Sequence, residues 1–263
     1  MGRLTGVAVA LAAGMFLAGA APAVAQAAQG SDDPLTLTAT VDGQDIAGHT
    51  MVIIPSRPVQ LAVTVVNNTG TPTHIRSIRL SGTALALTFF AYDTTLPFDV
   101  AAHGRVTRTF GLDLADLDGQ AIGLLPASVQ LFDVDRNELV AVDTVTDVRG
   151  SILSVYGVFG IAVLLLTIAA WAACLLALAR HRLPANRWRR ALRFMPAGFG
   201  TGLVAVVTLS VLRMIPPEPS VEIPIVIGTT AIGLLLGYLT PHPLPPVVEP
   251  ETKRIPLTRE VTG

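Results

Sequence analysis

Acidic side chains gather at one point of the sequence, where Asp113, Asp116 and Asp118 precede Gly119. Carboxylate oxygens are the ligands that hard cations such as calcium prefer, so these three residues are a candidate metal site. Acid-rich loops also keep a secreted domain soluble, and we prefer that interpretation. A second acidic group, at 133–138, begins like a calcium loop but has Glu138 where the loop needs glycine. We expect a hairpin turn there.

A histidine and a thioether, which soft copper accepts, stand two residues apart at His49 and Met51. His74 and His103 could approach them from other strands. One such pair is common by chance, and no methionine-rich stretch accompanies it. The favoured interpretation is a loop histidine beside a core methionine.

Signatures of enzymes are absent from residues 26–150, which contain no nucleophile elbow, metalloprotease helix, P-loop or dinucleotide fingerprint. The glycine-rich run at 198–202 lies inside an apolar segment, without the strand that precedes a nucleotide loop. We therefore expect no enzymatic activity and no cofactor.

Hydropathy divides the chain into the segments on which these residues lie. The chain is 51% hydrophobic and 14% charged, with a mean hydropathy of +0.59, which excludes a wholly soluble protein. Arg3, an apolar run and the small residues Ala23 and Ala25 predict a signal peptide at 1–25. An uncleaved N-terminal anchor is the alternative, and either exports the segment that follows.

Three charge-free runs are long enough to span a bilayer, which needs about 20 helical residues. The loop between the first two holds six arginines and no acidic residue, and the positive-inside rule places it in the cytoplasm. The arginines are Arg180, Arg182, Arg187, Arg189, Arg190 and Arg193. The predicted segments are membrane helices at 151–179, 194–213 and 223–240, the basic loop at 180–193, an exterior turn at 214–222 and a proline-rich cytoplasmic tail at 241–263.

Residues 26–150 form a different kind of segment, with 14 acidic side chains, 7 arginines and no lysine. Alternating apolar residues and β-branched content predict short strands. The strands are at 35–41, 51–54, 59–66, 75–80, 85–92, 105–112, 128–133 and 139–148. Turns are expected at 67–70, 81–82, 118–119 and 135–137.

This pattern predicts an all-β sandwich that resembles, in a general sense, the immunoglobulin-like modules of bacterial surface proteins. No cysteine pair supports a true antibody-type domain, because Cys174 is the only cysteine and lies in the first apolar span. Arg149 and Gly150 join the last strand almost directly to that span, so the domain should sit close to the bilayer. The residues expected between the sheets are Val63, Val65, Leu87, Phe89, Phe110, Leu131 and Val142.

Two pairs of glycines four residues apart, Gly198 with Gly202 and Gly233 with Gly237, predict close helix packing, between the second and third spans or against another subunit. The six arginines set the topology and could contact anionic lipid headgroups. With Trp188 as the only aromatic residue among them, nucleic-acid binding is not expected.

The fold class expected is therefore a β-sandwich ectodomain followed by three transmembrane helices. The arginine bias, 17 against a single lysine, suggests a GC-rich bacterial genome, and the chain is expected in the plasma membrane with 26–150 outside. The preferred hypothesis is an envelope protein whose sandwich is an interaction or accessory module for a protein partner. The alternatives are a non-catalytic subunit of a transport system and an exterior metal-binding protein.

Overall fold

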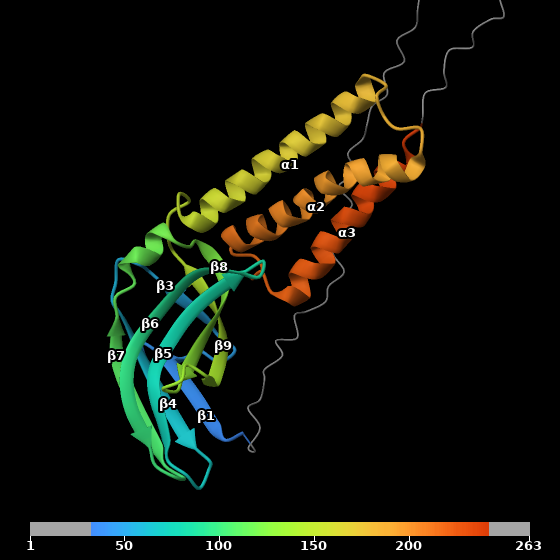
Figure 1. Ribbon diagram of the computed structural model, residues 1–263. Coiled ribbons are helices and arrows are strands. Elements are labelled where there is room, and N and C mark those ends of the chain that lie inside the picture. Colours follow the sequence, from blue (N-terminus) through green and yellow to red (C-terminus); the bar gives the residue numbers. More distant parts are fainter. Residues whose placement is uncertain (1–32, 242–263) are drawn as a thin grey trace, which may run out of the picture.

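A computed structural model describes residues 33–241 and contains two β-sheets followed by three long apolar helices (Figure 1). All three helices meet the β domain at the same end of it, where the chain passes from the last strand into α1 (Figure 1). The predicted signal peptide at 1–25 and positions 242–263 of the predicted tail lie outside the described residues.

The strands form one sheet of four and one of five. In the five-stranded sheet β3 runs parallel to β9, and the other pairings are antiparallel. The four-stranded sheet has the order β2 (Gln44–Asp45), β1 (Leu35–Val41), β4 (Val59–Asn67) and β7 (Arg105–Leu112). The five-stranded sheet has the order β3 (Thr50–Ile53), β9 (Glu138–Val148), β8 (Gly123–Phe132), β5 (Thr73–Ala84) and β6 (Leu87–Val100).

Alternation along the strands builds a single hydrophobic core from both sheets. Strand β4 buries every second residue, as expected of a strand with one face inward. Val63, Val65, Leu131 and Val142 are buried as predicted. Leu87 is half exposed, so its prediction is wrong: it directly follows the β5–β6 turn, at the end of the strand pair. Phe89 and Phe110 are only partly buried against the core.

The predicted turn at Ser81 and Gly82 is also wrong, because both residues lie inside β5. Gly82 pairs across the sheet with Phe90, and a Cβ at Gly82 would overlap the Phe90 ring. The glycine is needed for this close aromatic contact and does not reverse the chain. Strands β5, β6 and β8 are accordingly longer than predicted. Asp118 and Gly119, also expected in a turn, close a short 3₁₀ helix, η1 (Ala115–Gly119).

The helices are α1 (Val155–Ala179), α2 (Arg187–Val211) and α3 (Pro219–Leu239), each long and apolar enough to cross a bilayer. Helix α2 begins seven residues before the predicted span because the Asn186 side chain caps the amides of Trp188 and Arg189. Helix α3 begins with a proline in its first turn and takes in Glu222, so the predicted exterior turn is shorter than 214–222. Helix α2 lies between α1 and α3 (Figure 1).

Candidate functional site

Polar contacts join elements far apart in the sequence at the surface where the β domain meets the helices, which we call the junction. Its first part is the link from β9 to α1. The amide of Arg149 donates to the carbonyl of Ile53 at 2.9 Å, and that of Tyr156 donates to the carbonyl of Gln120 at 3.1 Å. Ser154 caps α1 by accepting from the amide of Gly157. The link is therefore bonded to the β domain along its length.

Aromatic packing continues the core of the β domain into α1. Tyr156 is fully buried and belongs to the same cluster as the strand residues. Its ring centroid lies 4.6 Å from that of Phe89, and Phe159 lies 5.8 Å from the same ring, both in edge-on geometry. Phe89, expected between the two sheets, thus packs against the first helix.

The end of α2 is held by two neighbouring strands. Ser210 donates to the carbonyl of Leu124 on β8 at 2.6 Å. Opposite Leu124 in the sheet is Asp147 of β9, which accepts from Nε of Arg213 at 2.6 Å and from Nε of Arg149 at 3.2 Å. The Asp147 side chain is only 8% exposed, whereas the two arginines are 37% and 54% exposed. One buried carboxylate therefore binds both the link that leads into α1 and the segment that follows α2.

Arg213 occupies a backbone position that ordinarily favours glycine. Its φ is 59°, and the amides of Arg213 and Met214 donate to the carbonyls of Ser210 and Leu209. These two bonds are the C-terminal cap in which a left-handed residue closes a helix. A side chain there costs about 1 kcal/mol relative to glycine. The bond from Arg213 to Asp147 gives a reason for an arginine at this strained position.

The tip of the β5–β6 hairpin reaches α3. Ala84 pairs with Leu87, which leaves a two-residue turn of Leu85 and Ala86 with φ of 52° and 59°. Such turns normally use asparagine and glycine. The amide of Leu85 donates at 2.7 Å to Oε1 of Glu222, a buried side chain in the first turn of α3. Each of the three helices thus supplies a side chain or amide to the junction.

The glycine pairs predicted to pack helices lie between α2 and α3. A Cβ on Gly198 would stand 3.0 Å from Cα of Gly233, and a Cβ on Gly237 would stand 2.8 Å from Cα of Ala191. Gly202 faces Cα of Val226 at 2.7 Å in the same way. The glycines of α2 and those of α3 therefore pack against each other's helix within this chain.

Gly200, between two of these glycines, points to the opposite side of α2. A Cβ there would overlap the hydroxyl of Thr167 on α1. Beside it, Nε1 of Trp171 donates to Oγ1 of Thr201 at 3.0 Å. Residues two apart lie about 200° apart around a helix, so one short motif packs α2 against α1 on one side and α3 on the other.

The six arginines of the predicted basic loop at 180–193 lie at the end of the helices that is far from the β domain, and five of them are exposed. Arg190 differs, because it is buried. Its Nε donates to the carbonyl of Gly237 at 3.0 Å and Nη2 donates to that of Tyr238 at 3.4 Å, which caps the last turn of α3. The expected lipid contact of Arg190 is corrected accordingly: its guanidinium is used inside the protein.

The structure does not bring the predicted metal ligands together. Within residues 33–241, no three His, Cys, Asp or Glu side chains group as metal ligands. Asp113 accepts from the amide of Ala115, and Asp116 and Asp118 are exposed on η1. Met51 is in the core. The loop at 133–138 is the β8–β9 hairpin, as expected, with Oδ1 of Asp133 accepting two amides.

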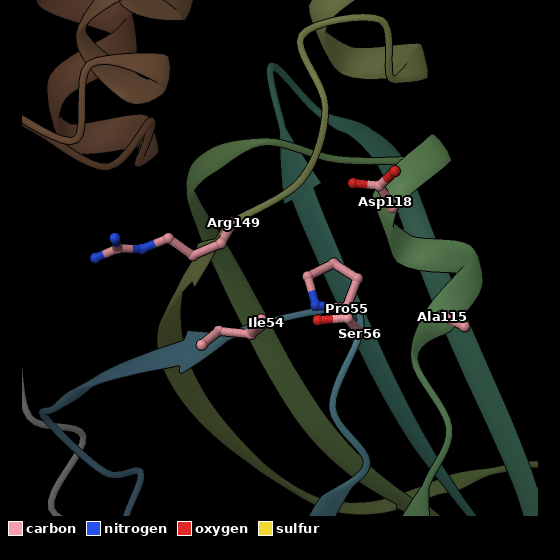
Figure 2. A pocket seen from close by; sticks show the side chains of 6 residues that line it. All are labelled: Ile54, Pro55, Ser56, Ala115, Asp118 and Arg149. Atoms are coloured by element: carbon pink, nitrogen blue, oxygen red, sulfur yellow. The ribbon is translucent and has the colours of Figure 1, made fainter.

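A shallow cavity of about 310 Å³ borders the junction (Figure 2). Its lining comprises Ile54, Pro55, Ser56, Ala115, Asp118 and Arg149. Figure 2 shows the Arg149 side chain extending away from Pro55, Ser56, Ala115 and Asp118. Its Nε donates to the carboxylate of Asp147. Asp118 and Arg149 are the two charged residues of this lining, and Nε of Arg149 is already bonded to Asp147.

Several junction residues carry no signal of their own in the sequence. Asp147 and Arg213 are 66 positions apart, and each alone is indistinguishable from a surface charge. Glu222 has a weak signal, since it is an acidic residue directly before an apolar run. Tyr156 has another, as an aromatic residue near the start of a predicted span.

Comparisons with known proteins place the chain in no family. No family model matches it, and no curated protein matches it in sequence. Solved structures resemble it weakly. A Niemann-Pick type C2 protein from the Japanese carpenter ant is 6% identical with a TM-score of 0.34, over 42% of this chain and 89% of that one. A FixG-related protein from Vibrio parahaemolyticus is 12% identical with a TM-score of 0.28, over 44% and 98%. The C-terminal domain of wzt is 11% identical with a TM-score of 0.33, over 45% and 75%.

Proposed function

We propose that this chain is a membrane-anchored protein of the bacterial cell envelope. Its β domain would be an immunoglobulin-like sandwich on the exterior face of the plasma membrane, and would serve as an interaction or accessory module for a protein partner in a membrane assembly. The two sheets with one shared core and the three apolar helices support the architecture. The signal-like N-terminal sequence supports export.

The distribution of charge supports this orientation. The exposed arginines lie at the end of the bundle farthest from the β domain, where the positive-inside rule predicts cytoplasm. The β domain itself carries 14 acidic residues against 7 arginines over 26–150. A cysteine replacing Asp99, whose side chain is 75% exposed, should react with a membrane-impermeant maleimide on intact cells. A cysteine replacing exposed Arg189 should react only after lysis, and the reverse pattern would refute this topology.

The observation that carries the functional proposal is the junction. Contacts from Tyr156 of α1, Ser210 of α2, Arg213 just after α2, and Glu222 of α3 hold the β domain in one orientation on the helices. A domain held in this way presents its surface at a fixed height and angle above the bilayer. That geometry suits a module that positions a partner within a membrane assembly, because a preorganised surface loses less entropy on binding.

Crosslinking in native membranes tests the proposal. A photo-reactive residue at Arg57, Asp99 or Arg105 of the β domain should capture one defined protein reproducibly, and detergent extraction should co-purify it. Asp147→Ala should reduce the yield with the β domain still folded, because the orientation is lost. Recovery of the chain alone from all three positions would contradict a partner-binding role.

The alternative of a transport subunit that packs on a permease through its glycine pairs has less support. Gly198, Gly202, Gly233 and Gly237 already contact residues of the same chain. A permease would therefore have to use another face of the bundle.

A further inference from the structure

Five exposed arginines form a basic patch around the end of the helix bundle far from the β domain. They are Arg180, Arg182, Arg187, Arg189 and Arg193. None of them forms an ion pair with a carboxylate in the described part of the chain. The acidic residues between 33 and 241 all lie in the β domain or at the end of the bundle that joins it. The patch therefore has no counter-charge among the described residues.

The backbone increases this imbalance. Arg187, Arg189 and Arg193 stand on the first two turns of α2, and its first turn contains no acidic residue. The N-terminal end of a helix carries a partial positive charge, so cations there are unfavourable without an anion nearby. Asn186 caps two of the free amides, but as a neutral side chain it adds no charge. The arrangement is consistent with an anion supplied from outside the chain.

Aromatic residues indicate the level of the patch relative to a bilayer. Trp188 is 70% exposed and packs edge-on against Tyr238 with ring centroids 5.6 Å apart. The guanidinium carbon of Arg187 lies 5.8 Å from the centre of the same tyrosine ring. Exposed tryptophan and tyrosine side chains at the ends of membrane helices prefer the headgroup region. The arginines next to them are then level with the lipid phosphates.

We propose that this patch binds the phosphates of anionic phospholipids. Arg187 would bind one beside Trp188 and Tyr238, whose rings would lie against the glycerol and the upper acyl chain. Arg189 and Arg193, four residues apart and therefore together on another side of α2, would bind a second. A guanidinium group donates two parallel hydrogen bonds to a phosphate, which a lysine cannot do. Arg190 is not part of the patch, because its guanidinium caps α3. The patch lies at the opposite end of the bundle from the junction and is independent of any protein partner.

Nucleic acid offers the same phosphates but fits this position less well. The patch lies at the end of α1 and the start of α2, and the exposed tryptophan beside it is paired with a tyrosine of α3. A strand of nucleic acid would have to reach headgroup depth to contact both. An oligonucleotide is therefore included in the test as a competitor.

The experiment uses the full chain purified in a neutral detergent, with Trp171→Phe so that Trp188 is the single tryptophan. Energy transfer from Trp188 to dansyl-labelled phosphatidylglycerol or phosphatidylcholine reports binding. We expect phosphatidylglycerol to bind at least about tenfold more tightly, with the preference weakening at high salt. Arg187→Gln, Arg189→Gln and Arg193→Gln together should weaken it about 100-fold. Inorganic phosphate and a single-stranded oligonucleotide should not displace it at equal concentration.

The matched control replaces three exposed arginines of the β domain, Arg57, Arg105 and Arg136, by glutamine, and should leave the affinity unchanged. If the triple variant of the patch misfolds, Arg189→Gln alone should still weaken binding about fivefold. Equal binding of the two lipids, or unchanged binding in the patch variants, would overturn the proposal. Displacement by the oligonucleotide would assign the patch to nucleic acid instead.

Discussion

The guanidinium of Arg213, at the end of α2, donates a 2.6 Å hydrogen bond to the buried carboxylate of Asp147 on β9. Arg149, at the start of the link to α1, donates to the other oxygen of the same carboxylate at 3.2 Å. One side chain of the β domain thus fixes the chain where it enters the first helix and where it leaves the second.

The first prediction separates this bond from the strain that accompanies it. Asp147→Ala removes the acceptor of both arginines and should lower the free energy of unfolding by about 2 kcal/mol. Arg213→Ala loses one bond and keeps the strained backbone, whereas Arg213→Gly loses the same bond but recovers about 1 kcal/mol at a φ of 59°. In thermal unfolding in detergent, the melting temperature of Arg213→Gly should be higher than that of Arg213→Ala, and that of Asp147→Ala should be the lowest. Equal loss in the two Arg213 variants would contradict the strain argument.

The second prediction concerns the contact between the hairpin tip and α3. Glu222→Ala leaves the amide of Leu85 without its acceptor and should cost about 1–3 kcal/mol. Glu222→Gln keeps a carbonyl oxygen of the same reach, so it should retain most of the stability. The comparison is made by thermal unfolding and by hydrogen exchange of the Leu85 amide. An amide equally protected in Glu222→Ala would show that the bond does not hold the hairpin.

Ala86 allows a third prediction, in the stabilising direction. Its φ of 59° is strained for alanine and free of strain for glycine. Ala86→Gly should raise the free energy of unfolding by up to about 1 kcal/mol. Ala91→Gly, at an exposed strand position of β6, is the control and should destabilise. Destabilisation of similar size by both variants would argue against a left-handed turn at 85–86.

A fourth prediction tests the helix packing with two glycines of one helix. In α3, Gly233 lies against Cα of Gly198, whereas a Cβ on Gly228 would have no atom within 4 Å. Gly233→Leu must push two backbones apart and should destabilise by about 3 kcal/mol or more. Gly228→Leu should be tolerated, since its side chain enters open space. Thermal unfolding of the two variants in detergent provides the comparison, and equal melting temperatures would contradict the packing described for α2 and α3.

The fifth prediction follows from two carboxyls of the β domain. Hydrogen bonds from Asn137 lower the pKa of Asp133, and the Arg79 guanidinium lowers the pKa of Asp93. Because the pKa is lower in the folded state, the stabilisation is complete above the ordinary carboxyl pKa of about 4 and is lost as the pH falls through the lowered value. The melting temperature should therefore fall less between pH 6 and pH 2.5 in Asp133→Asn with Asp93→Asn than in the unaltered chain. An identical fall would contradict these shifts.

The hydrophobic pattern was sufficient to predict most strands, because one face is buried and burial repeats every second residue, as in β4. It was also sufficient for the apolar part of each helix, because a long charge-free run is recognisable without knowing what it packs against. It could not predict the Leu85–Ala86 turn, since neither residue type favours a left-handed backbone. The turn expected at Gly82 is wrong because glycine is equally common in turns and at close aromatic contacts within strands.

The junction was beyond sequence reasoning for a different reason. Its polar contacts join residues whose spacing follows no helical or strand period, such as Leu85 with Glu222. The burial of Arg190 was equally impossible to predict, because nothing in the sequence distinguishes it from the five nearby arginines, which are exposed. Such contacts depend on how the helices pack against the sheets, and the local pattern of hydrophobic and polar residues does not specify that packing.

The junction holds the β domain in one orientation on the helices. Spin labels on cysteines replacing Asp99 of β6 and Leu239 at the end of α3, in a Cys174→Ser background, measure this directly by pulsed electron resonance in lipid nanodiscs. We expect a single narrow distance distribution that broadens in Asp147→Ala. A broad distribution in the unaltered junction, as expected of a domain on a flexible tether, would contradict it.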